Sequence, residues 1–413
     1  MHSNYVDCQN FVKDCENKSF LVELGASLFA EKNYNLVNIS RDLNISYSNE
    51  KEINSEKNGG LGVWDGAEWK IRFVDGSSSS WYDGILGKAK MIWRYKMGLF
   101  SGKTLAFDLA EKFFHIYDYL NNDNHYLFVE DILSNLNLTW TVESTAKDFF
   151  LKKGVNENFV DEIIGGLVRN TYGQYVDKIT AFGGLISLYS AVGEVYSSKN
   201  GNMNIFKEML EVSKNVNLKL NSKVITVEKK TESGEFIVTT ADNKTTVFDI
   251  VVVATPLNKV KFDNIALPIQ QVEYVTVHTT IVIGKLNLNY FKLKDYKELP
   301  ESILIPSSAD CPFNSFSIKT WINGTDAAIV KFFSPKKLEK SLLEQIFVGT
   351  QQVYRRSIEA YPKLELKNLN KWKTPFQLTE GLFYVNGMEE WISTMETESL
   401  SGLNIVNYLK NKY

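Results

Sequence analysis

Residues 248–257 read FDIVVVATPL, a short apolar run between an acid and a Thr-Pro step. A β-branched run without polar alternation predicts a strand buried on both faces, as in parallel sheets. Ligands of open parallel sheets bind at the carboxyl ends of the strands. We therefore expect Ala254, Thr255 and Pro256, which end this run, to face a ligand, although the chain shows no glycine-rich phosphate-binding loop.

The composition is that of a globular chain and excludes several classes of function. Its 413 residues, 44% of them hydrophobic, suffice for two or three domains. A net charge of −3 leaves no electrostatic footprint for nucleic acid. Three cysteines without a C-x-x-C pair predict neither a disulfide framework nor a zinc site. No signal peptide is readable, no apolar run reaches the roughly 18 residues of a membrane span, and the N-x-[ST] sequons decide nothing about secretion.

Apolar periodicity predicts sheet segments interrupted by a helical insertion. We expect a strand and a helix start over 20–30, a hairpin over 62–73, helices between 81 and 191, strands over 218–230, 234–256 and 275–288, an amphipathic helix over 334–358, and a C-terminal strand, glycine turn and long helix.

Two turns offer backbone amides to a ligand. Gly201 and Asn202 precede a predicted helix over 203–212, so their amides are candidates to face a phosphate or a flavin ring. Gly387 follows a predicted strand over 382–385, and the helix beginning near Thr394 directs its positive end beyond that strand. A plain turn and a plain helix cap are the alternatives. No Walker loop, H-E-x-x-H or G-x-S-x-G occurs, and no catalytic residue is predicted.

Taken in order, these motifs resemble the prenylcysteine oxidase family, also called prenylcysteine lyase, within the flavin amine oxidase and phytoene desaturase superfamily. The matching order extends from about Glu23 to Leu409. The resemblance rests on Trp93-Arg94-Tyr95, Tyr172-Gly173-Gln174 with Ala181-Phe182 following, FDIVVVATPLN, and LFYVNGMEEWISTMETES.

The resemblance implies that the cofactor is FAD, and it assigns roles along the dinucleotide. Val224 would lie beside the adenine, and Ala254, Thr255 and Pro256 would line the dinucleotide where their strand ends. Gly387 would let the backbone approach the pyrophosphate or ribityl chain, with Glu389 nearby. Met395 would begin the helix whose N-terminus faces the N1-C2=O edge of the flavin, where negative charge accumulates on reduction.

For the substrate, the resemblance implies farnesyl- or geranylgeranyl-cysteine. Hydride loss from the carbon between sulfur and alkene, followed by addition of water, would release a prenyl aldehyde and cysteine, with molecular oxygen reduced to hydrogen peroxide. Trp93, Tyr95 and Tyr172 are candidates for the prenyl pocket, with structural core as the alternative role of each. The resemblance also implies a lysosomal, vacuolar or secretory location.

The predicted fold class is α/β: a Rossmann-like FAD-binding domain assembled from discontinuous segments, plus an α+β substrate domain with a large helical insertion. The first would comprise 1–45, 200–262 and 375–413, and the second 46–199 and 263–374.

The first βαβ unit, with its G-x-G-x-x-G, is expected to be missing, since Gln9-Asn10-Phe11 stands where the resemblance expects Gly-Gly-Arg. Weak FAD binding would follow. Two alternatives stay open: another flavin amine oxidase, and a non-catalytic remnant or prenyl-lipid-binding protein without flavin.

Overall fold

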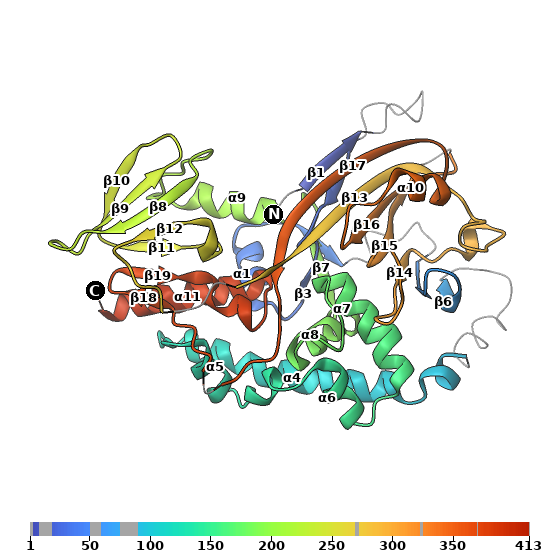
Figure 1. Cartoon of the computed structure of the whole chain (residues 1–413), viewed down its shortest axis with the longest axis horizontal. Helices are drawn as coiled ribbons and strands as arrows, with labels where there is room; N and C mark the ends of the chain where they lie inside the picture. Colours follow the sequence, from blue (N-terminus) through green and yellow to red (C-terminus); the bar gives the residue numbers. More distant parts are fainter. Residues whose placement is uncertain are drawn as a thin grey trace.

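The computed structural model describes residues 3–7, 19–49, 59–74, 90–268, 272–322, 325–369 and 371–412. Within these ranges the chain forms a mixed α/β fold with five sheets and a layer of helices along one side (Figure 1). This confirms the predicted fold class. The Gln9-Asn10-Phe11 segment lies outside the described residues.

The largest sheet has seven strands and forms one half of the molecule (Figure 1). The hairpin predicted over 62–73 is one edge of this sheet, and its turn is fixed by Asp65, whose carboxylate accepts the amides of Ala67 and Glu68. In spatial order the strands are β17 (Phe347–Pro362), β13 (Tyr274–Leu286), β16 (Ala327–Ser334), β15 (Ser315–Trp321), β14 (Ser302–Leu304), β5 (Gly60–Trp64) and β6 (Trp69–Val74).

The prediction of an amphipathic helix over 334–358 is wrong for most of this range. A helix forms only at α10 (Lys340–Ile346), and the chain then becomes β17. β17 pairs antiparallel with β13 along almost the whole length of both strands. This ladder supplies backbone hydrogen bonds and packing that outweigh the local helical periodicity, and the β-branched and aromatic residues of β17 suit a pleated surface.

The remaining strands of the described ranges form four smaller sheets. The strands predicted over 218–230, 234–256 and 382–385 are all present. Their bounds are β1 (Ser3–Asp7) with β2 (Ser19–Glu23); β3 (Phe29–Ala30), β7 (Val195–Ser198) and β4 (Tyr47–Asn49); β10 (Thr245–Phe248), β9 (Phe236–Thr240), β8 (Val224–Lys229) and β12 (Lys261–Asp263); and β11 (Val251–Val253), β19 (Leu382–Tyr384) and β18 (Gln377–Thr379).

The strand from FDIVVVATPL is less buried than its sequence predicts. β11 pairs in parallel with β19, as expected for a Rossmann-like sheet, but Val253 is buried whereas Val252 is 45% exposed. In the described ranges β19 is the one strand that pairs with β11, so the other edge and one face of β11 lie open. The expectation of burial on both faces is therefore wrong for Val252.

The helices of the predicted 81–191 insertion are found from residue 90 onward. None of the helices in the described ranges has the length and hydropathy needed to span a bilayer. The insertion contains α4 (Gly98–Leu120), α5 (Val129–Asn135), α6 (Ala146–Lys152), α7 (Gly165–Tyr172) and α8 (Ala181–Val192), with a π-helix (Phe159–Ile164) and a 3-10 turn (Thr139–Val142); outside it lie α1 (Tyr34–Asp42), α9 (Met203–Val212), α11 (Met395–Lys412) and the 3-10 turns Leu257–Lys259, Tyr296–Glu298 and Val385–Glu390.

An aromatic cluster joins the C-terminal segment to the helical layer. Trp391, just before α11, packs its ring against Phe182 of α8 at 4.6 Å and Phe113 of α4 at 5.8 Å between centroids. All three side chains are buried. Burial of such large aromatic surfaces is worth several kcal/mol, on the order of 2 to 3 per side chain. The N-terminus of α11 is thereby held against α4 and α8.

Candidate active site

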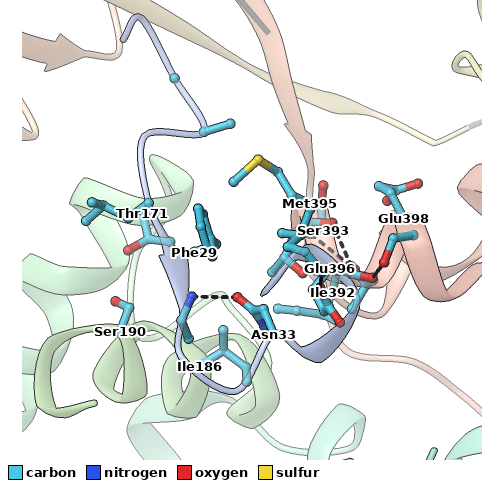
Figure 2. A pocket seen from close by; sticks show the side chains of 18 of the residues that line it. Phe29, Asn33, Thr171, Ile186, Ser190, Ile392, Ser393, Met395, Glu396 and Glu398 are labelled. Atoms are coloured by element: carbon cyan, nitrogen blue, oxygen red, sulfur yellow. Dashed lines mark hydrogen bonds between the residues drawn. The ribbon is translucent and has the colours of Figure 1, made fainter. Parts of the chain in front are cut away.

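A cavity of about 700 Å³ lies where α1, α4, α8, the end of β17 and the start of α11 meet. Its wall is mainly apolar and includes Phe29, Phe113, Phe182 and Ile186. Figure 2 shows residues from distant parts of the chain, such as Phe29, Ile186 and Met395, around the same space. A volume of this size is typical of sites for drug-sized ligands, and the apolar wall suits a ligand that is mostly hydrocarbon.

The first turn of α11 closes one side of the cavity through Glu396. This carboxylate accepts the amide of Asn35 at 2.8 Å and that of Leu36 at 3.1 Å, and it also accepts the hydroxyl of Tyr117 from α4. Asn33, the N-cap residue of α1, gives no side-chain cap because its Oδ1 accepts the amide of Ala30 instead. Glu396 thus caps α1 from another helix and ties three elements of the cavity together.

A second acid of the same turn, Glu398, has an oxygen without a partner. Three acids line the cavity: Glu359 is paired with Lys259, Glu396 makes the bonds just described, and Glu398 Oε1 is buried with no hydrogen-bond partner among the described residues. Burial, and then the charge of nearby Glu389, raises the pKa of Glu398 well above its usual value. Glu398 is therefore suited to hold a proton inside the protein, next to the cavity.

The start of α11 also fits the ring end of a flavin. Ser393, Thr394 and Met395 line the cavity, so the positive end of the helix dipole borders it (Figure 2). The cavity is large and apolar enough for an isoalloxazine ring, and the positive end of α11 suits the edge where a reduced flavin gathers negative charge. The residues present therefore fit the group that the sequence led us to expect.

Tyr172 also lines the cavity, and α7 fixes its position. Arg169, one turn earlier, is fully buried and donates to the carbonyls of Pro306 at 2.7 Å and Ala309 at 2.9 Å, which anchors the helix to the loop after β14. Gly173 ends α7 with φ of +64°, a conformation that favours glycine. The Tyr172 hydroxyl is buried without a hydrogen-bond partner in the described ranges, and burial raises its pKa well above the usual value.

The two other candidates for the prenyl pocket lie elsewhere. Trp93 is 82% exposed and does not line the cavity. Tyr95 is buried, but its hydroxyl donates to Glu162 at 2.9 Å, beside the Arg94–Glu162 ion pair, and its ring packs on Phe159. Tyr95 therefore has the core role that was the alternative, and the structure does not place Trp93 in the cavity.

Among the predicted cofactor residues, Met395 lines the cavity and the residues expected beside the dinucleotide do not. Val224 begins β8 and is half-buried. Ala254 and Thr255 follow β11 and are exposed, and Pro256 is half-buried. Their roles toward the adenine and pyrophosphate stay predictions.

Gly201 and Asn202 are engaged inside the protein. The amide of Asn202 donates to the Glu23 carboxylate at 2.6 Å, its Nδ2 donates to the carbonyl of Ala26, and its Oδ1 accepts the amide of Ser198. These bonds join the start of α9 to the segment after β2. They occupy the groups that the sequence proposed for a phosphate or flavin, and neither residue lines the cavity.

Gly387 and Glu389 lie together in the turn before α11. A Cβ on Gly387 would meet Thr374 and Phe376 at ordinary contact distances of 3.5–3.6 Å, so the protein itself leaves room there. Glu389 accepts the Tyr274 hydroxyl at 2.6 Å, and burial raises the pKa of its carboxyl. The negative charge of Glu389 also contributes to the raised pKa of Glu398.

Comparison with known proteins decides the family. The family described as prenylcysteine lyase matches residues 77–413. The chain belongs to the prenylcysteine lyase family. It is 26% identical to a farnesylcysteine lyase of Arabidopsis thaliana over 95% of this chain and 77% of that protein, and 27% identical to prenylcysteine oxidase 1 of Homo sapiens over 92% and 77%.

Solved structures show the same fold at low identity. A triple mutant of putrescine oxidase superposes with a TM-score of 0.59 at 10% identity, covering 100% of this chain and 90% of that one. Cyclohexylamine oxidase from Brevibacterium oxydans gives 0.59 at 10% identity, covering 95% and 89%. Family and fold together confirm the predicted class, a flavin-dependent oxidoreductase.

The acids of the cavity were not found by reading the sequence. Glu396 and Glu398 lie in the first turn of a predicted helix, where acids are common because the positive end of the helix dipole stabilises their charge. Their spacing carried no further signal. Only the packing of α1 and α4 against this turn gives Glu396 its partners and leaves Glu398 Oε1 without one.

Proposed function

We propose that this chain catalyses the oxidative cleavage of the thioether in farnesyl- or geranylgeranyl-cysteine, with FAD as cofactor and molecular oxygen as electron acceptor. The products would be a prenyl aldehyde, cysteine and hydrogen peroxide. Family membership supports the reaction class. The observation that carries the proposal is the large apolar cavity bordered by the N-terminus of α11.

The cavity suits an amphiphilic substrate. Its aromatic and aliphatic wall would hold the prenyl chain and exclude water, while Lys32 and Arg356 bring positive charge to the same wall, where a cysteine carboxylate is complementary. Lys32 Nζ lies 5.5 Å from the centre of the Phe114 ring, so a charged and an apolar contact are adjacent there. Such a site binds both ends of a prenylated cysteine.

The chain's own groups then position the reaction. Bound FAD would supply the hydride acceptor. The amide end of α11 would stabilise negative charge at the cavity, and the Glu398 carboxyl, whose pKa is raised, would hold a proton beside it. Positioning against the cofactor supplies most of the rate, so a strong base is not required.

Turnover of farnesylcysteine by the FAD-loaded protein tests the proposal, with aldehyde, cysteine and peroxide quantified. Ile186→Phe, which narrows the cavity, should raise KM or reduce turnover about tenfold or more. Ile225→Phe, at the exposed position of β8, is the matched control and should leave turnover unchanged. Turnover of monoamines with no reaction on farnesylcysteine would instead identify another flavin amine oxidase.

A binding protein without flavin is the second candidate. The exposure of Ala254 and Thr255, away from the cavity, is the observation that favours it. Such a protein would bind farnesylcysteine without retaining flavin after purification or reconstitution. Bound flavin per folded molecule, measured by absorbance, separates the two functions.

The cellular location is also a proposal. By resemblance to the family we place the protein in the lysosome, the vacuole or the secretory pathway. Microscopy of the tagged full-length protein against markers of these compartments tests this, and an exclusively cytosolic signal would contradict it.

A further inference from the structure

Large apolar side chains lie exposed where the chain enters α4. Trp93, which the sequence suggested for the substrate pocket, is 82% exposed, and three more large apolar side chains nearby in the chain are more than half exposed. Scattered exposed apolar residues are normal, but a group this dense within nine residues marks an interaction surface. The α4 apolar patch consists of Ile92 (60% exposed), Trp93, Met97 (64%) and Phe100 (58%).

Along the sequence, the charged residues next to the α4 apolar patch are positive as far as Asp108. The segment 90–107 contains Lys90, Arg94, Lys96 and Lys103 and no acid. Arg94 is paired with Glu162, whereas the three lysines are exposed. An exposed tryptophan with other apolar side chains, surrounded by lysines, is the composition of surfaces that lie in the interface of an anionic membrane.

One face of α4 connects this patch with the cavity. Phe100, Phe107 and Phe114 are spaced by seven residues, which places them on one stripe of the helix about 21 Å long. Phe107 packs against Tyr189 at 5.2 Å between ring centres, and Tyr189 lines the cavity. Phe114 lines the cavity itself. The phenylalanine stripe of α4 therefore extends from the exposed patch to the candidate active site.

We propose that the α4 apolar patch docks on an anionic phospholipid bilayer, so that a prenylated substrate passes from the membrane along the phenylalanine stripe into the cavity. This inference rests on the proposed function, because a prenylcysteine is an amphiphile that partitions into bilayers. The lysines complement anionic headgroups, and the apolar side chains enter the headgroup–acyl boundary. A protein partner would not require the stripe that leads to the cavity.

Vesicle binding by the full chain tests the proposal without any need for turnover. The protein is sedimented with phosphatidylcholine vesicles that contain or lack phosphatidylserine. We expect binding that depends on phosphatidylserine and weakens with salt. Trp93→Ala and Phe100→Ala should each reduce it about tenfold, and Lys96→Glu several-fold. Phe248→Ala, on exposed β10, and Lys214→Glu, after α9, are matched controls that should bind like the parent.

Absence of binding to phosphatidylserine vesicles would overturn the proposal, as would equal losses in the patch and control variants. Self-association that Trp93→Ala abolishes would also overturn it and identify the patch as an interface between two copies. Turnover of farnesylcysteine dispersed in detergent is measured separately. A chain that binds vesicles without such turnover refutes the proposed reaction and leaves the docking surface standing.

Discussion

Replacing Glu396 should weaken the junction of α1, α4 and α11. Its Oε1 accepts the amide of Asn35 and the Tyr117 hydroxyl, and its Oε2 accepts the amide of Leu36. In Glu396→Gln one of the two positions becomes an NH2 group. If the NH2 faces Leu36, that amide loses its acceptor, and if the NH2 faces Asn35, only the Tyr117 hydroxyl can rotate to accept. Either orientation leaves one buried amide of α1 facing a donor.

The loss of stability depends on how many of these hydrogen bonds each variant removes. One buried amide without an acceptor costs about 1 to 3 kcal/mol, and loss of all three bonds in Glu396→Ala costs more. Burial raises the pKa of Glu396 despite its three donors, so desolvation offsets part of the gain from the charge. We therefore expect losses in the free energy of unfolding of about 2 kcal/mol for Glu396→Gln and about 4 kcal/mol for Glu396→Ala.

Urea unfolding followed by fluorescence measures both losses, with Glu380→Gln as the control. Glu380 carries the same side chain on the surface, and its substitution should change the stability by less than about 0.5 kcal/mol. A Glu396→Gln protein as stable as the parent would refute the role of Glu396 as the cap of α1. Hydrogen exchange at Asn35 and Leu36 should also accelerate in the variant, since both amides lose protection when α1 frays.

Two further predictions concern the cavity and the turn before α11. The pKa of Glu398 is raised above 4.5, so the folded state binds the proton more tightly and the free energy of unfolding falls as pH rises from 4.5 toward the folded pKa. In Glu398→Gln the free energy of unfolding should depend less on pH, and at about pH 8 the variant should be at least as stable as the parent. Urea titrations at several pH values that give the same pH dependence for both proteins would contradict this. Gly387→Ala fits the protein without a clash, so its stability should be retained while bound flavin decreases if the backbone approaches the cofactor. Unchanged flavin per folded molecule would make Gly387 a simple turn residue.

The sequence by itself determined the elements whose signals are local. α9 spans the predicted residues 203–212, the hairpin forms at the Asp-Gly turn, and the C-terminal strand, turn and helix occur in the predicted order. The order of motifs also indicated the family. These signals are strong because hydrophobic period and turn chemistry act over a few residues and need no distant partner.

Tertiary structure decided what depends on contacts between distant segments. β17 is a strand because β13 offers it a long edge to pair with, although its own sequence has helical spacing. The amide of Leu36 finds its acceptor in Glu396, 360 residues later in the chain, and Trp93 is exposed whereas Tyr95, two residues later, is buried. The cavity itself is assembled from segments more than 300 residues apart in the chain. A local pattern shows which face of an element is apolar, but the partner that covers this face, or leaves it open, is set by packing.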